Sequence, residues 1–396
     1  MISKSKNGEE LSKYTSSGVK KLDQIDAVRG VAILLVMFHH TANIFPEMPY
    51  PVKKITNFGW YGVQLFFIAS AVTLLLSWHK QPEGGSGKTV GFFLHRIFRI
   101  APMYYLGGAL YFLLRPPGEL ANLKQLLLSM VFVNSWNPSW MPTIGNTWMV
   151  VPGGWSISVE FCFYLIFPIL AGYCSSIKKS LIFLIASFVL MVISNPIGGS
   201  YLSMRYDEKA IDNFLYFWLP NQLIVFSLGF LVYFVIQSKS KYCLAVKKIA
   251  IDNNLSIPII GILMFFTLTQ FSSSHYFVES FPYLPTHFLV SVIFSIILVS
   301  LLSCSSPSRL IVNSFTVAFG KISFSAYVLH FGVLDLIKMN DDFGFRTGGY
   351  EAIFYFSCVI LPIALMGTFV LSSVTYQVIE LPFIKVGRKL TKKLLF

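Results

Sequence analysis

The stretch DAVRGVAILLVMFHH, residues 26–40, decides between two kinds of fold. Eight apolar residues, Val31 to Phe38, lie between an aspartate and an arginine on one side and two histidines on the other. In a water-soluble protein this pattern is typical of a buried helix. In a membrane it places ionisable groups at a depth where they are costly and usually functional. The composition of the whole chain indicates which environment applies.

The chain is far more apolar than a soluble protein. Its 396 residues are 55% hydrophobic and 12% charged, whereas soluble domains carry about 25% charged residues. Apolar runs that approach the roughly 20 residues needed to cross a bilayer recur along it. We therefore predict an all-α, polytopic integral membrane helical bundle with about ten transmembrane helices. The predicted spans are 30–45, 59–78, 99–114, 155–174, 180–195, 215–237, 256–271, 284–303, 322–338 and 351–375, and the shorter apolar stretch 123–135 is predicted to be interfacial or re-entrant.

Positive charge is concentrated on one side of these spans. When the spans alternate in direction, 23 of the 31 Lys and Arg residues fall on the side that holds both termini. Cytoplasmic loops of membrane proteins are enriched in Lys and Arg, so we predict that both termini are cytoplasmic. The net charge of +13 is then explained by contact with anionic membrane lipids, and no nucleic-acid partner is expected.

We predict one membrane domain between two short tails. Residues 1–25 are polar and are expected to form a cytoplasmic N-terminal tail rather than a cleaved signal peptide. Residues 26–385 form the transmembrane domain, and residues 386–396 form a basic cytoplasmic C-terminal tail. The five cysteines lie in or beside apolar stretches without metal-ligand spacing, so no metal site is expected. The loop PEGGSGKT, residues 82–89, has Pro82 where a nucleotide-binding loop needs glycine.

Helical phase separates the two histidines of the opening stretch. At about 100° per residue, Asp26, Arg29 and His40 share one helix face, and His39 points about 80° away. Arg29 is expected near the cytoplasmic edge, with His40 about 16 Å further along, near mid-membrane. His40 is then either a functional group in a wet cavity or a structural histidine bonded to a backbone carbonyl.

Two more clusters place charge at the spans. Glu160 lies five residues into a predicted span, after Trp155 and Ser156. A carboxylate there needs a partner or a proton, in a functional site or in a structural ion pair. Arg96 and Arg99 lie one turn apart at the start of another span. Two guanidiniums suit a phosphate-bearing ligand, although by themselves they are more simply explained by anchoring on the cytoplasmic side.

A third cluster lies in KISFSAYVLHFG, residues 321–332. Ser323, Tyr327 and His330 occur at i, i+4 and i+7, so they share one face of a helix. This spacing makes His330 a second intramembrane histidine with polar neighbours. Hydrogen-bonded packing and catalysis are both compatible with the pattern.

Taken together, six motifs resemble the acyltransferase-3 family of integral membrane acyltransferases. In chain order they are IDAVRGVAILLVMFHH (25–40), GVQLFFIASAVTLLLS (62–77), HRIFRIAPMYYL (95–106), WSISVEFCFYLIFP (155–168), ISFSAYVLHF (322–331) and IELPF (379–383). The arginine-to-histidine spacing of the family's first motif matches Arg29 and His40. The chain departs from the family pattern at Gln64, which replaces an acidic residue, and at Phe161, which replaces a second glutamate.

The resemblance implies an enzyme of the bacterial inner (plasma) membrane. Such proteins move an acyl group, usually acetyl, from cytoplasmic acyl-CoA to a hydroxyl of a cell-surface or exported glycan, such as O-antigen, capsule or another exopolysaccharide. Acetyl-CoA is then a co-substrate, and no permanently bound cofactor is expected. The acceptor is a glycan or a lipid-linked saccharide, and a homo-oligomer is compatible with this activity.

The polar residues acquire expected roles from this chemistry. His40 suits the general base that deprotonates the hydroxyl, and Asp26 or Glu160 is expected to set its tautomer. The residues expected to bind acyl-CoA are Arg29, Arg96 and Arg99. The residues expected to line the acceptor path or to support it are Ser323, Tyr327, His330, Trp155 and Ser156.

Several alternatives remain open. Acyl transfer proceeds either directly or through an acyl-histidine intermediate. A secondary transporter or flippase for a glycan-linked or small anionic solute also suits many spans with intramembrane ionisable groups. Transporters often show similarity between their two halves, which is not evident here, so the enzyme is favoured over the transporter and over a membrane scaffold.

Overall fold

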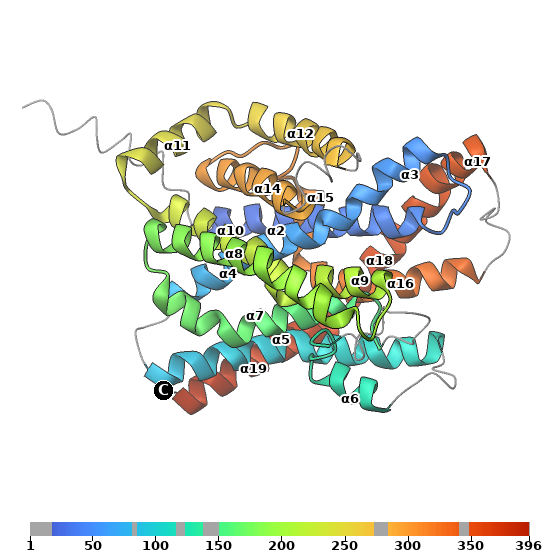
Figure 1. The fold of residues 1–396 in the computed structure, drawn as a ribbon, viewed down its shortest axis with the longest axis horizontal. Helices are drawn as coiled ribbons and strands as arrows, with labels where there is room; N and C mark the ends of the chain where they lie inside the picture. Colours follow the sequence, from blue (N-terminus) through green and yellow to red (C-terminus); the bar gives the residue numbers. More distant parts are fainter. Residues whose placement is uncertain are drawn as a thin grey trace, which may run out of the picture.

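The computed structural model describes residues 18–80, 85–115, 123–137, 150–272, 284–339 and 348–395. Within these ranges the fold consists of helices without a β-strand, which confirms the all-α prediction (Figure 1). The same ranges hold eight helices long and apolar enough to cross a membrane, or up to ten spans if each of two sharply bent helix pairs counts as one. The chain is therefore a multi-pass membrane protein, as its composition predicts.

The helices follow the predicted spans closely. The first ten elements are α2 (Gly18–Ala42), α3 (Tyr50–Asn57), the 3₁₀ turn η1 (Phe58–Tyr61), α4 (Gly62–Lys80), α5 (Gly85–Leu114), α6 (Leu123–Met130), α7 (Gly154–Tyr173), α8 (Ile177–Leu202), α9 (Glu208–Phe217) and α10 (Leu219–Gln237). The others are α11 (Lys241–Asp252), α12 (Ser256–Ser272), α14 (Thr286–Ser303), α15 (Ser314–Lys321), α16 (Ser323–Lys338), α17 (Gly349–Phe354), the π-helical turn η5 (Tyr355–Ile360), α18 (Leu361–Thr375), the π-helical turn η6 (Tyr376–Glu380) and α19 (Leu381–Leu395).

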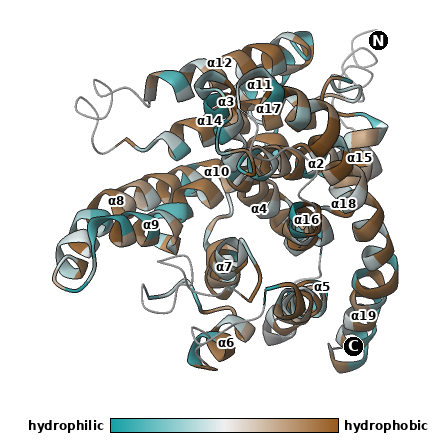
Figure 2. Ribbon diagram, turned by 90° about the vertical axis from the view of Figure 1, so that its right-hand side faces the viewer, coloured by the Kyte–Doolittle hydropathy of each residue, from teal (hydrophilic) through white to brown (hydrophobic). Residues whose placement is uncertain are grey.

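Burial divides these helices into inner and outer ones. α10 packs against α4, α8 and α14, and most of its side chains are buried. A helix that is apolar on all sides is stable only inside a bundle or in lipid. α8 is equally apolar, but only 17% of its most apolar window is buried, as expected for a helix that faces lipid. In Figure 2 most of the helices are coloured as apolar along most of their length.

Two glycines bring α15 against the middle of the bundle. A Cβ atom on Gly30 of α2 would collide with the carbonyl of Thr316, and one on Gly320 of α15 would collide with the carbonyl of Asp26. The two backbones are therefore in direct contact. α15 and α16 then meet at an angle of 84°, so this contact fixes where α16 enters the bundle.

One predicted span begins much earlier in the structure than expected. α5 starts at Gly85, well before the predicted start of its span, so Arg96 and Arg99 lie inside a long helix. The apolar segment from residue 123 forms α6, which has only 8 residues and is too short to cross a bilayer, in agreement with the prediction that this segment does not span the membrane. The first span covers Leu22–Ala42, so His40 lies near the end of its helix, and its depth in the membrane stays a prediction.

Candidate active site

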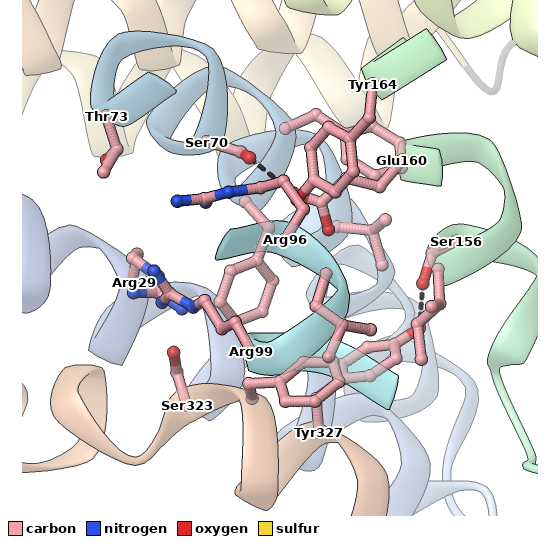
Figure 3. Close-up of a pocket in the computed structure, with 16 residues that line it drawn as sticks. Arg29, Ser70, Thr73, Arg96, Arg99, Ser156, Glu160, Tyr164, Ser323 and Tyr327 are labelled. Carbon is pink, nitrogen blue, oxygen red and sulfur yellow. Dashed lines mark hydrogen bonds between the residues drawn. The ribbon is translucent and has the colours of Figure 1, made fainter. Parts of the chain in front are cut away.

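A cavity of about 70 Å³ lies where α2, α4, α5, α7 and α16 meet (Figure 3). Five motifs that are distant in sequence contribute to its wall. Seven of its lining residues are ones that the sequence singled out: Arg29, Arg96, Arg99, Ser156, Glu160, Ser323 and Tyr327. Ser70, Thr73 and Tyr164 complete the polar lining, and nothing in the sequence pattern distinguished these three from ordinary helix residues.

Three guanidinium groups converge at this cavity. Arg29 comes from α2, and Arg96 and Arg99 come from successive turns of α5. The three are close enough for the charge of Arg99 to act on both of the others. Among the described residues, Nε of Arg96 is buried without a hydrogen-bond partner. Like charges buried together are costly, and an unsatisfied guanidinium N–H adds to that cost. This arrangement is suited to an anionic ligand.

Two carboxylates offset part of this positive charge. Glu160 accepts a hydrogen bond from the Ser70 hydroxyl, and its charge acts on Arg29 and Arg96. Glu380, from η6, is only 2% exposed and accepts a hydrogen bond of 2.8 Å from Ser325 Oγ. The charges of Arg29 and Arg99 act on Glu380. Glu380 was not among the predicted site residues, although its position in the IELPF motif beside an apolar span was a usable signal.

The two histidines of the first span face different neighbours. The His40 ring lies against α16, with its centroid 5.4 Å from that of His330 and 4.3 Å from that of Phe331. His39 lies within hydrogen-bond distance of Asn43, 3.1 Å between Nε2 and Nδ2, and its ring meets Trp60 edge-on at 6.4 Å. The prediction that helical phase separates the two histidines is confirmed.

Hydrogen bonds fix the tautomer of His330. Its Nδ1 lies 2.8 Å from the carbonyl oxygen of Tyr327 and 3.2 Å from that of Ala326. A carbonyl oxygen only accepts, so Nδ1 carries the proton and Nε2 carries the lone pair. Within the described ranges this buried Nε2 has no hydrogen-bond partner. His330 therefore presents a free basic nitrogen inside the bundle, beside the ring of His40.

Tyr327 lies between the cavity and the histidines. Its ring lines the cavity, and its hydroxyl donates to the Gly153 carbonyl at 3.0 Å and accepts from Ser156 Oγ at 2.8 Å. Its own carbonyl accepts from His330. α16 therefore joins the two parts of the site, with Ser323 in the cavity at one end and His330 about 10 Å further along.

Four predicted site residues lie outside the cavity lining. His40 and His330 form the neighbouring pair described above. The ring of Trp155 is tilted against that of Phe217, with centroids 4.1 Å apart, and it meets the ring of the cavity residue Phe67 edge-on at 6.4 Å. Asp26 precedes His40 by fourteen residues, about 21 Å of helical rise, so the expectation that Asp26 sets the tautomer of His40 is wrong. The nearest rings to His40 are those of His39, His330 and Phe331.

The described part of the chain offers no obvious metal site. No cluster of three or more His, Cys, Asp or Glu side chains that could hold a metal ion occurs there. The polar groups described above are the arginine-lined cavity and the histidine pair. Together with the fold, these define a helical membrane protein with a buried cavity lined by three arginines.

Comparison with known proteins shows which family of helical membrane proteins the chain belongs to. The sequence model of the acyltransferase-3 family, which is described as an acyltransferase domain, matches residues 22–377. The chain therefore belongs to the acyltransferase-3 family of membrane proteins. No solved structure shows significant similarity to the chain.

Three relatives illustrate the family. A Staphylococcus aureus (strain COL) protein provisionally named an O-acetyltransferase is 22% identical over 92% of this chain and 58% of its own length. A provisionally named acetyltransferase of Acidianus two-tailed virus is 24% identical over 82% of this chain and 87% of its own. The exopolysaccharide production protein ExoZ of Rhizobium meliloti (strain 1021) is 31% identical over 28% of this chain and 33% of its own. The chain thus spans somewhat more than half of the staphylococcal relative.

Proposed function

We propose that this protein is a membrane O-acyltransferase that moves an acyl group, in the first instance acetyl, from acyl-CoA to a hydroxyl of a cell-surface or exported glycan. The observation that carries the proposal is the convergence of Arg29, Arg96 and Arg99 on one cavity, next to a histidine pair. Family membership supports acyl transfer, and the name of the ExoZ relative supports an exported polysaccharide as acceptor. The bacterial inner membrane is the proposed location.

The donor is proposed to lie along α16. The arginines suit the pyrophosphate of coenzyme A, because guanidinium groups bind phosphate oxygens in a bidentate manner. His40 lies about 16 Å beyond Arg29 along α2, a separation that an extended pantetheine arm is long enough to cover. Ser323, which has a buried hydroxyl with no partner in the described part of the chain, lies along this path. The thioester is then placed near His40 and His330.

The chemistry requires a base, because a thioester is already activated but a hydroxyl is a weak nucleophile. In the proposed step, His40 accepts the proton of the acceptor hydroxyl while the oxygen of that hydroxyl attacks the carbonyl carbon of the thioester. The carbon–sulfur bond then breaks, and the coenzyme A thiolate takes the proton from the imidazolium. Glu160 is proposed to hold Arg96 and Tyr164 in place, since its charge acts on both groups.

The test compares the wild type with His40→Ala in cells, with surface-glycan acetylation measured by mass spectrometry. We expect the variant to insert and fold normally but to lose acetylation, since a general base contributes about 10²–10⁴-fold to a rate. Full acetylation by His40→Ala would overturn the assignment of the base. A purified wild type that moves a solute without binding or turning over acyl-CoA would identify a transporter instead.

A further inference from the structure

The cavity accommodates only a small part of an acyl-CoA donor. Its volume of about 70 Å³ is well below the roughly 300–1,000 Å³ of pockets that enclose whole small ligands. If its arginines bind the pyrophosphate, as the proposed function requires, the adenosine and its 3′-phosphate must lie outside the cavity. The adenosine and its 3′-phosphate are therefore expected to bind on the surface next to the arginines.

The last helix, α19, lies along that surface. α19 runs beside α5, as Figures 1 and 2 both show. The contact is close, because a Cβ atom on Gly387 would lie 2.7 Å from Cβ of Phe98. The charge of Arg388 acts on His95, which immediately precedes the cavity residue Arg96. At its start, α19 follows Glu380, on which Arg29 and Arg99 act.

The basic residues of α19 form a single stripe. At about 100° per residue, they fall within an arc of roughly 140°, and Gly387 and Thr391, which are buried, lie outside that arc. The members of this basic stripe are Lys385, Arg388, Lys389, Lys392 and Lys393, all of them exposed. No acidic residue occurs between Leu381 and Leu395. Arg388 is at the edge of the stripe nearest to α5, where its charge acts on His95.

We infer that the basic stripe of α19 binds the 3′-phosphate of the acyl-CoA nucleotide, while the cavity arginines hold its pyrophosphate. This inference rests on the proposed function. A 3′-phosphate is a terminal, doubly charged group, which suits several exposed Lys and Arg side chains without demanding a preformed pocket. The proximity of Arg388 to the helix that carries Arg96 and Arg99 places the stripe at the correct end of the donor. Lipid headgroups carry phosphate too, so the experiment must separate the two sources.

The experiment uses purified full-length protein in nanodiscs of phosphatidylcholine, which has no net charge. Binding of coenzyme A and of 3′-dephospho-coenzyme A is measured by calorimetry for the wild type and for the double variant Arg388→Gln, Lys392→Gln. We expect the wild type to bind coenzyme A on the order of tenfold more tightly than the dephospho form, because several charge-assisted contacts are lost together. The double variant should bind both ligands equally, with the affinity of the wild type for the dephospho form.

A matched control carries Lys241→Gln and Lys248→Gln, which remove two exposed charges from α11, and it should retain the wild-type preference. If the wild type lacks that preference, or if the double variant keeps it, the inference is wrong while the proposed function stands. If the wild type binds neither ligand, the proposed function fails first. If the double variant differs from the wild type only in nanodiscs that contain phosphatidylglycerol, the stripe binds lipid headgroups and the nucleotide assignment is overturned.

Discussion

His40 and His330 lie side by side but are held in different ways. The Nδ1 proton of His330 is directed to backbone carbonyls, so its free Nε2 has a fixed position. His40 is held by packing between the rings of His39, His330 and Phe331. A base whose tautomer is fixed needs no reorganisation before it accepts a proton or a hydrogen bond. We therefore expect His330 to contribute to acyl transfer together with His40.

This expectation is tested by His330→Asn and His330→Ala. Asparagine retains an N–H donor close to the position of Nδ1, so the bond to the Tyr327 carbonyl is kept while Nε2 is lost. We expect His330→Asn to keep near wild-type thermal stability and to lose about 10²-fold or more in turnover. If His330 only packs α16, His330→Asn should stay active and only His330→Ala should be impaired, through a cavity that lowers stability.

The carboxylate of Glu380 offsets part of the positive charge of the cavity residues Arg29 and Arg99. Glu380→Gln keeps a group that can bond Ser325 but removes a buried negative charge that acts on Arg29 and Arg99. Leaving buried charge uncompensated costs about 3–5 kcal/mol, so the melting temperature should fall. Anionic coenzyme A should then raise the melting temperature of Glu380→Gln more than that of the wild type. Equal ligand-induced shifts in a thermal-unfolding assay would show that Glu380 is outside the donor's electrostatic reach.

The sequence predicted these residues unevenly, for physical reasons. The shared face of Arg29 and His40 followed from helical periodicity alone, because both residues lie on one helix. Arg29 lines the same cavity as Arg96, Arg99 and Glu160 because of the way separate helices pack. Hydropathy does not predict that packing. The Ser325–Glu380 bond joins residues 55 positions apart and was equally inaccessible.

At the scale of elements, the contact between α2 and α15 controls the placement of α16. Gly30 and Gly320 each face a backbone carbonyl of the other helix, so neither position has room for a side chain. The apolar pattern predicted one span at 322–338 but not the bend of 84° that precedes it. An apolar pattern predicts that a segment is buried, but it does not predict the direction of the helix axis.

Gly320→Ala tests the role of this contact. The added methyl group must push α15 away from α2, and overpacking of this kind costs about 1–3 kcal/mol. The displaced α16 should also reduce turnover, because it carries Ser323, Tyr327 and His330. Gly172→Ala in α7 is the control, since nothing lies within 4 Å of a Cβ atom built there, and alanine favours a helix by about 1 kcal/mol. Equal thermal stability and turnover in the two variants would contradict the argument.

At the scale of the whole molecule, the position of the site and the distribution of charge support one orientation. The basic stripe of α19 and the start of α5 lie toward one end of the bundle, which is the end where the C-terminus lies in Figure 1. His40 lies toward the other end of its span. If the basic end is cytoplasmic, as the Lys and Arg distribution predicts, the donor enters from the compartment that holds acyl-CoA and the acceptor approaches from outside.

This orientation is tested with topology reporters on the active full-length protein. Green fluorescent protein fused after Phe396 should fluoresce, because it folds in the cytoplasm. Alkaline phosphatase inserted after Met204, an exposed position between α8 and α9, should be active, because that enzyme needs the oxidising outer compartment for its disulfides. The same insertion after Lys239, between α10 and α11, is the control and should be inactive. The opposite pattern would place the arginines on the outer side, where no acyl-CoA is available, and would remove the basis for a cytoplasmic donor even if the histidine variants lose activity.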